Sequence, residues 1–135
     1  MCIRDSYQIV ARYAADVGLR AKAYGNLGSA YHQMGETMKA KQCLETALQL
    51  VPDQPAVMVR LGLIAQKNGD LPEAVRQYSH AMAVQPTDVG YLLLAQALQL
   101  QGRSDEAKAI FERVARFSPN LPAAQKEAES LLSGK

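Results

Sequence analysis

Three prolines divide the chain into segments of nearly equal length. Pro52, Pro86 and Pro119 stand 34 and 33 residues apart, and each closes a segment with the same spacing of small and apolar residues. The three copies of this skeleton are Tyr24, Leu27, Gly28, Tyr31, Gly35, Ala40, Leu44 and Ala47; Met58, Leu61, Gly62, Ala65, Gly69, Ala74, Tyr78 and Ala81; and Tyr91, Leu94, Ala95, Leu98, Gly102, Ala107, Phe111 and Val114. A unit of this size cannot bury its own apolar face. The repeat therefore predicts units that stabilise one another by stacking side by side.

Each segment predicts two amphipathic helices. Its apolar residues recur at intervals of three and four, first over about fourteen residues and then again after a glycine, and nothing in the chain suggests a strand. Gly35, Gly69 and Gly102 stand where the first helix must end and the chain must reverse, a position that favours a positive φ. The third copy has lost one residue between Pro86 and Tyr91, in a turn, so both helical faces stay in phase.

Other residues predict how these helices begin and pack. Asp70 with Glu73 predicts a capping box at the start of a second helix. Gly28, Gly62 and Ala95 lie in the middle of first helices, where glycine costs up to about 1 kcal/mol relative to alanine. We therefore expect their small size to serve close contact between helices.

The pattern resembles the tetratricopeptide repeat of the 34-residue type, over about residues 21–121. In that family the first helix carries a bulky residue, Leu-Gly and Tyr, and the second carries Ala, an aromatic residue, Ala and a closing Pro. The departures are mild: Tyr24, Met58 and Tyr91 stand where the family often has Trp, and Leu44 replaces an aromatic residue. The resemblance implies an all-α fold, a right-handed superhelical α-solenoid of antiparallel helix pairs. Its whole repeats are expected at 21–54, 55–87 and 88–121.

The N-terminal segment is expected to differ from the whole repeats. Residues 7–20 keep the helical spacing and predict the second helix of a truncated, partial repeat, followed by a linker. Residues 1–6 resemble the translation of a transposase adapter used in DNA library preparation. We therefore expect a non-native scar on a fragment of bacterial, metagenomic origin, with a genuine start as the alternative.

The C-terminal segment, residues 122–135, predicts a capping helix and a tail. Its apolar residues fall on one face, at Ala124, Ala128, Leu131 and Leu132. Gln125 and Glu129 are expected at the positions that Tyr91 and Ala95 hold in the third repeat. A polar surface there would end the stack, as terminal repeats require.

Composition bounds the class of partner. Of the 135 residues 48% are hydrophobic, enough for one elongated core, and the net charge is +2. Basic residues of the third repeat alternate with acids, as Lys108, Glu112 and Arg116 do, at a spacing that lets them pair along a helix. We therefore expect a solvated helix face and no nucleic-acid partner.

The most apolar stretch, Tyr91 to Leu100, is far shorter than the roughly 20 residues that span a bilayer. We expect no membrane insertion by this segment, and a soluble, cytoplasmic location.

The sequence offers no candidate for catalysis. His32 and His80 are the only imidazoles, and neither has a second ligand at metal spacing. Ser29 lies near His32, but no acid is placed to orient the ring and no oxyanion site is indicated. Cys43 is expected to be a packing residue. We therefore expect no enzyme activity, no cofactor and no metal in this segment.

The family resemblance implies a partner-binding groove. In such arrays the first helices of successive repeats form the inner surface. Carried over to this chain, those positions are Lys22, Gly25, Ser29, His32 and Gln33; Ala56, Val59, Leu63, Gln66 and Lys67; and Val89, Leu92, Gln96, Gln99 and Leu100. Val59, Leu63 and Leu92 form an apolar centre with amides around it, which suits a peptide or short helix. The alternative is that these apolar residues only pack against one another and against a missing N-terminal repeat.

One specialised function of the family is not expected. Some members grip the acidic tails of chaperones with a clamp of Lys, Asn and Arg. The corresponding positions here hold Gly25, Ser29, Arg60, Val89 and Leu93, of which only Arg60 is basic.

Two functions follow from the sequence. The first is a non-catalytic scaffold that binds a protein or peptide in the groove. The alternative is a C-terminal docking or regulatory arm of a larger bacterial enzyme, for example a glycosyltransferase, whose catalytic part lies upstream. The sequence favours no particular oligomeric state.

Overall fold

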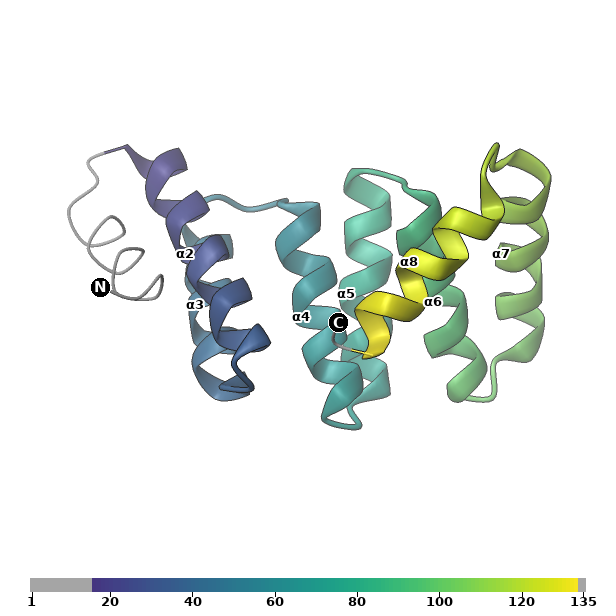
Figure 1. The fold of residues 1–135 in the computed structure, drawn as a ribbon, viewed down its shortest axis with the longest axis horizontal. Coiled ribbons are helices and arrows are strands. Elements are labelled where there is room, and N and C mark those ends of the chain that lie inside the picture. Colours follow the sequence, from purple (N-terminus) through teal and green to yellow (C-terminus); the bar gives the residue numbers. More distant parts are fainter. Residues whose placement is uncertain (1–15, 134–135) are drawn as a thin grey trace.

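The computed structural model describes residues 16–133, so residues 1–6, most of the segment expected at 7–20 and the last two residues of the tail lie outside the described residues. The described part is helical, without strands, and its helices follow one another in adjacent pairs (Figure 1). The helices are α2 (Val17–Gln33), α3 (Thr37–Leu50), α4 (Pro55–Lys67), α5 (Leu71–Val84), α6 (Asp88–Leu100), α7 (Ser104–Phe117) and α8 (Leu121–Ser133). Extensive contacts join α2 to α3, α4 to α5 and α6 to α7, which are the three predicted helix pairs. The expected all-α solenoid is confirmed.

The first pair begins earlier than expected. The helix α2 starts at Val17 rather than near residue 21. Asp16 caps it, because its carboxylate accepts a hydrogen bond of 2.8 Å from the backbone N–H of Leu19. The expected boundary at residue 21, which follows from the repeat length, therefore excludes the first turn of α2.

The same turn joins the two helices of every pair. Gly35, Gly69 and Gly102 have φ values of 82°, 82° and 85°, as their positions predicted. The next residue in each turn donates its backbone N–H to the carbonyl five residues earlier, over 2.8–2.9 Å, for example from Asp70 to Ala65. This is the hydrogen-bond pattern of a Schellman motif, which satisfies carbonyls at the helix end and needs a residue that tolerates positive φ.

The closing prolines set where the second helices end. The residues before them, Val51, Gln85 and Ser118, are the C-caps of α3, α5 and α7 and have extended backbones. Steric conflict with the proline ring disfavours the helical conformation at the preceding residue, so each second helix must stop there. The connection after Pro52 holds one residue more than the connection after Pro86, and Asp53 in that longer loop has a φ of 62°.

Small residues in the first helices allow the close contact that we expected. A Cβ added to Gly28 would lie 2.7 Å from Cγ of Leu44, and one added to Gly62 would lie 2.5 Å from Cε1 of Tyr78. Both facing side chains are almost fully buried. The glycines are therefore required by the larger side chains of the paired helix.

The capping box predicted at α5 is half formed. The Asp70 carboxylate accepts a hydrogen bond of 3.2 Å from the backbone N–H of Glu73. No return bond from the Glu73 side chain is present, because its carboxylate accepts hydrogen bonds from Arg76 and Gln77 instead. The cap of α5 thus rests on Asp70.

The last helix corrects one prediction. The helix α8 starts two residues after Pro119, as α6 starts two residues after Pro86. Ala124 and Ala128 therefore hold the positions of Tyr91 and Ala95, and the predicted Gln125 and Glu129 are exposed beside them. The reason is the length of the connection before α8. It equals the shorter connection, the one after Pro86, so the equivalent residues of α8 lie one position earlier than expected.

The placement of α8 also differs from that of the earlier first helices. It packs closely against α6, whereas its contacts with α7 are few. Figure 1 shows it crossing in front of α6 towards α4. Ala124 and Ala128 are buried in the same apolar cluster as Leu92 and Leu63, and Leu131 packs against that cluster. Two alanines on the contact face allow this close approach to α6.

Candidate partner-binding groove

The predicted groove positions of the first two helix pairs meet in a hollow between α2 and α4. Its volume is about 190 Å³. It is lined by Lys22, Gly25 and Ser29 from α2 and by Ala56 from α4. Arg60 of α4 adds a second basic group to this lining.

A larger hollow of about 450 Å³ continues from there along α4 to α6. Ala56 lines both hollows and so connects them. Val59 and Leu63 of α4 and Val89 of α6 make this second hollow apolar. The helix α8 contributes Leu131 and Glu127 to its lining.

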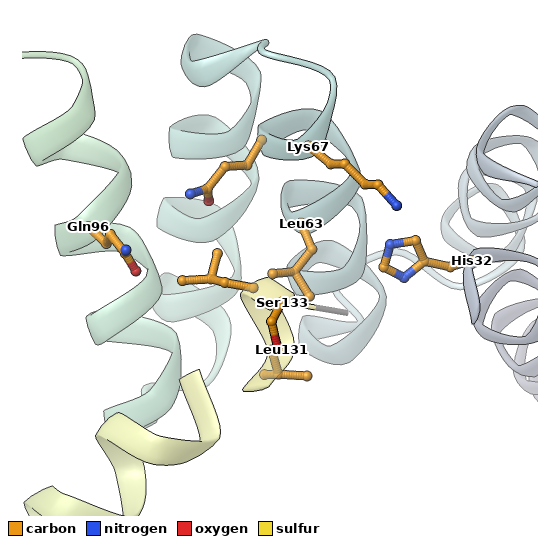
Figure 2. Close-up of a pocket in the computed structure, with 8 residues that line it drawn as sticks. His32, Leu63, Lys67, Gln96, Leu131 and Ser133 are labelled. Atoms are coloured by element: carbon orange, nitrogen blue, oxygen red, sulfur yellow. The ribbon is translucent and has the colours of Figure 1, made fainter. Parts of the chain in front are cut away.

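A third hollow, of about 280 Å³, brings together side chains from four helices. Its lining consists of His32 from α2, Leu63, Gln66 and Lys67 from α4, Gln96 from α6, and Leu131, Leu132 and Ser133 from α8. Figure 2 shows His32 reaching from α2 towards Leu63, with Leu131 and Ser133 of α8 close below that leucine. Leu63 and Leu131 line the second hollow as well, so the three hollows form one continuous surface.

Four predicted positions lie outside these hollows. Gln33, Gln99 and Leu100 are exposed near the C-terminal ends of α2 and α6, and Leu100 is 59% exposed. Leu92 is buried in the core cluster that it shares with α8. The apolar centre predicted for the groove is thus partly covered by the chain itself.

Several lining residues were not predicted as part of the groove. Arg60 was considered only as a clamp residue, although it lies one turn from Ala56 on the same helix face. Glu127 and Leu131 come from α8, which was expected to be a capping helix and was not expected to line the groove. No local signal in α8 indicates that its side chains line hollows beside α4, because the two helices are far apart in the sequence.

Hydrogen bonding fixes one of the groove amides. The phenol of Tyr78 donates a hydrogen bond of 2.9 Å to Oε1 of Gln66. That bond uses one acceptor site of the Gln66 oxygen and does not engage its amide N–H groups. Burial of the Tyr78 phenol raises its pKa, so the phenol stays protonated and remains a donor.

Burial and two cationic neighbours act on the imidazole of His32. Burial lowers the pKa of His32 below its ordinary 6.5, and the nearby charges of Arg60 and Lys67 lower it further. Burial also lowers the pKa of the Arg60 guanidinium. His32 therefore favours its neutral form, in which the ring both donates and accepts hydrogen bonds.

The described residues contain no arrangement typical of a metal or catalytic centre. No group of three or more His, Cys, Asp or Glu side chains in residues 16–133 is placed to hold a metal ion. His80 lies 3.4 Å from Asp53, atom Nε2 to Oδ1, in an exposed pair. Cys43 is half-buried against the core, and burial raises the pKa of its thiol, which makes it less reactive. No helix within the described range has the length and apolar content needed to cross a bilayer.

Comparison with known protein families agrees with this geometry. Two models described as tetratricopeptide repeat match residues 19–87 and 65–132. The chain belongs to the tetratricopeptide repeat family. The matches together cover residues 19–132, so this tetratricopeptide array includes nearly all of the helices and of the residues that line the three hollows.

Two curated relatives of this tetratricopeptide protein carry the array within much longer chains. One is cellulose synthase operon protein C of Xanthomonas axonopodis pv. citri (strain 306), 38% identical over 93 residues. The other is the human protein O-mannosyl-transferase TMTC1, 32% identical over 90 residues. The matches cover 68% and 66% of this chain but only 6% and 10% of those relatives. The chain therefore spans a tenth or less of the length of either protein.

Proposed function

We propose that this chain is a non-catalytic protein–protein interaction scaffold that binds a peptide or short helix along α2, α4 and α6. The observation that carries the proposal is the continuous series of three hollows on these first helices. An apolar floor at Val59 and Leu63 is flanked by polar groups such as Gln66 and Gln96, a mixture typical of peptide-binding surfaces.

The distribution of charged side chains also supports a protein or peptide as the partner. The basic residues of α7 are balanced by acids, and Arg103 contacts Glu106 at 2.6 Å. The positions at which some family members carry a clamp for acidic chaperone tails hold only one basic residue here, Arg60. We therefore propose a protein or peptide partner, and neither a nucleic acid nor an acidic chaperone tail. We place this interaction in the cytoplasm, which the location of a tagged full-length protein would test.

Matched charge substitutions test the groove. Lys67→Glu with Gln96→Glu changes two exposed groove residues, and Lys41→Glu with Gln42→Glu makes the same changes on exposed positions of α3. Proteins captured by the wild-type chain are identified, purified and titrated against all three proteins. We expect the groove pair to weaken binding at least about ten-fold and the α3 pair to leave it unchanged. Equal affinity of both variants and the wild type would place the binding site elsewhere.

A second candidate function is favoured by the relatives. Both carry the similar segment within a much longer chain, and one of them is named as a mannosyl-transferase. This supports the alternative that the array is a docking or regulatory arm of a larger bacterial enzyme, for example a glycosyltransferase. Sequencing the reading frame upstream of Tyr7 decides between them. A catalytic domain there supports the arm, and further helical repeats alone support the scaffold.

A further inference from the structure

The helix α8 lies on the surface that the proposed function assigns to a partner. Its contact face consists of Ala124 and Ala128, which are 8% and 5% exposed, followed by Leu131. These side chains share one apolar cluster with Leu63 and Leu92, each only 5% exposed. Figure 1 shows the helix running from the top of α7 across α6 to the region of α4. The chain thus covers part of its own groove with an amphipathic helix.

The seat of α8 is only partly filled. It packs closely on α6, but beyond α6 its last two turns border hollows of about 280 and 450 Å³, both lined by Leu131. One water molecule occupies about 30 Å³, so these hollows have room for further side chains. Leu131 and Leu132 remain half-buried there. Solvent-accessible hollows leave these two leucines with fewer protein atoms around them than a core side chain has, so this end of α8 is held less firmly than a core helix.

The pattern of α8 shows what this surface accepts. Two alanines four residues apart allow the helix axis to approach α6 closely, and a leucine three residues later reaches the hollows beside α4. Anchors at i, i+4 and i+7 on one face are typical of a helix that binds in a groove. The opposite face carries the exposed Lys126 and Glu129 and keeps the free helix soluble.

We propose that α8 is a displaceable internal ligand of the groove, and that the partner is an amphipathic helix of the same pattern that binds on α4 and α6 in its place. This inference rests on the proposed function and adds the form of the partner and the competition that regulates it. An attached competitor acts at an effective concentration of about millimolar. The partner therefore binds weakly while α8 is seated, and release of α8 raises the apparent affinity of the groove.

Intramolecular competition can be measured with a peptide that is identical to α8. The probe is a synthetic peptide of residues 119–133, titrated into the full chain labelled for NMR. Ala128→Glu places a charge on the buried face of α8, and Ala123→Glu makes the same change on its exposed face as the control. We expect amide signals of α4 and α6 to shift, with an apparent Kd at least about ten-fold lower for Ala128→Glu than for the wild type. Ala123→Glu should bind as the wild type does.

A control peptide and a second variant make the result specific. A peptide with the same Ala128→Glu change should not shift these signals at the concentrations used. Circular dichroism checks that each variant keeps its helices. If Ala128→Glu does not fold, Leu131→Asp replaces it, because this residue lies in the last turns of α8 and is only half-buried, at the border of the two hollows.

Three outcomes would overturn the inference. The first is an equal apparent Kd for the wild type and both variants, and the second is no binding of the α8 peptide to any of them. The third is a concentration-dependent dimer of the wild type by light scattering, which would make a second copy the occupant of the groove. These outcomes leave the capture experiment of the proposed function unaffected. Conversely, if the peptide exchanges but capture ignores Lys67→Glu and Gln96→Glu, α8 is still an internal ligand, whereas the proposed partner site, and with it the proposed form of the partner, is rejected.

Discussion

Side-chain size at the contact between paired helices is fixed residue by residue. Gly62 faces the ring of Tyr78, which is fully buried and held at its far end by the hydrogen bond to Gln66. The ring therefore has little freedom to move away from an added methyl group. Gly25 lies on another side of a first helix, where an added Cβ would meet only Cγ2 of Val57 at 3.5 Å.

These two glycines make a matched pair for a stability measurement. Gly62→Ala should lower the free energy of unfolding by about 1–2 kcal/mol. The clash with Tyr78 destabilises the fold more than the higher helix propensity of alanine stabilises it. Gly25→Ala should raise it by up to about 1 kcal/mol, because the same gain comes without a clash. Urea denaturation followed by circular dichroism measures both. An unchanged or higher stability of Gly62→Ala would show that Tyr78 can move.

The pH dependence of stability should contain a contribution from His32. Burial, and then Arg60 and Lys67, lower its pKa in the folded chain below the ordinary 6.5. Below about pH 6.5 the unfolded chain then binds more protons than the folded chain, so the free energy of unfolding falls as the pH decreases. The free energy of unfolding stops falling once the pH is below the lowered pKa of His32. Well above pH 6.5, His32 makes no contribution to the pH dependence.

The measurement compares wild type with His32→Gln at about pH 7.5 and at about pH 5, on either side of the ordinary histidine pKa. We expect the wild type to lose more stability than the variant between these two conditions. Arg60→Gln should raise the pKa of His32 in an NMR titration, whereas Arg113→Gln on α7 should leave it unchanged. If wild type and His32→Gln lose the same stability between the two pH values, His32 does not contribute to the pH dependence.

At the scale of the element, equivalent positions in different repeats are filled differently. Glu36, Asp70 and Arg103 all stand at the N-cap of a second helix, directly after a glycine turn. Only Asp70 among these three caps its helix with a side-chain hydrogen bond. Arg103 instead pairs with Glu106, and both side chains are largely exposed.

This difference predicts unequal costs for the same substitution. Asp70→Ala should lower the free energy of unfolding by about 1 kcal/mol, because an N–H at the start of α5 loses its partner. Arg103→Ala should cost less than about 0.5 kcal/mol, because an exposed ion pair stabilises little. Thermal and urea unfolding of the two variants measure the difference. A larger loss for Arg103→Ala would contradict the assignment of the cap.

The helices that lie within a repeat could be predicted from the sequence, because their limits are set locally. Gly69 and Pro86 bound α5 through positive φ and through the restricted residue before proline. Most predicted groove positions line one continuous surface, because they stand at fixed distances in sequence from the glycine turns and the closing prolines. The seat of α8 could not be predicted, because Leu131 lines the same hollows as Leu63 across a long separation in sequence.

At the scale of the whole molecule, the core is divided along the array. Leu44 and Leu27 belong to a cluster that joins α2 and α3 to one side of α4, whereas Leu98 belongs to a cluster that runs from α4 to α8. The contact between α3 and α4 is less extensive than the contact between α5 and α6. Stability in such arrays is approximately a sum of terms from each repeat and from its nearest neighbours.

A cavity in one cluster should therefore loosen its own helices first. Leu44 is 1% exposed, and Leu44→Ala removes buried atoms that are worth about 2–5 kcal/mol. We expect faster hydrogen exchange in α2 and α3, with exchange in α6 and α7 nearly unchanged, because local opening need not cross the limited α3–α4 contact. Leu98→Ala, at a residue 3% exposed, should reverse the pattern. Equal acceleration along the whole chain in either variant would mean that the array unfolds as one cooperative unit, since only global unfolding exposes every helix together.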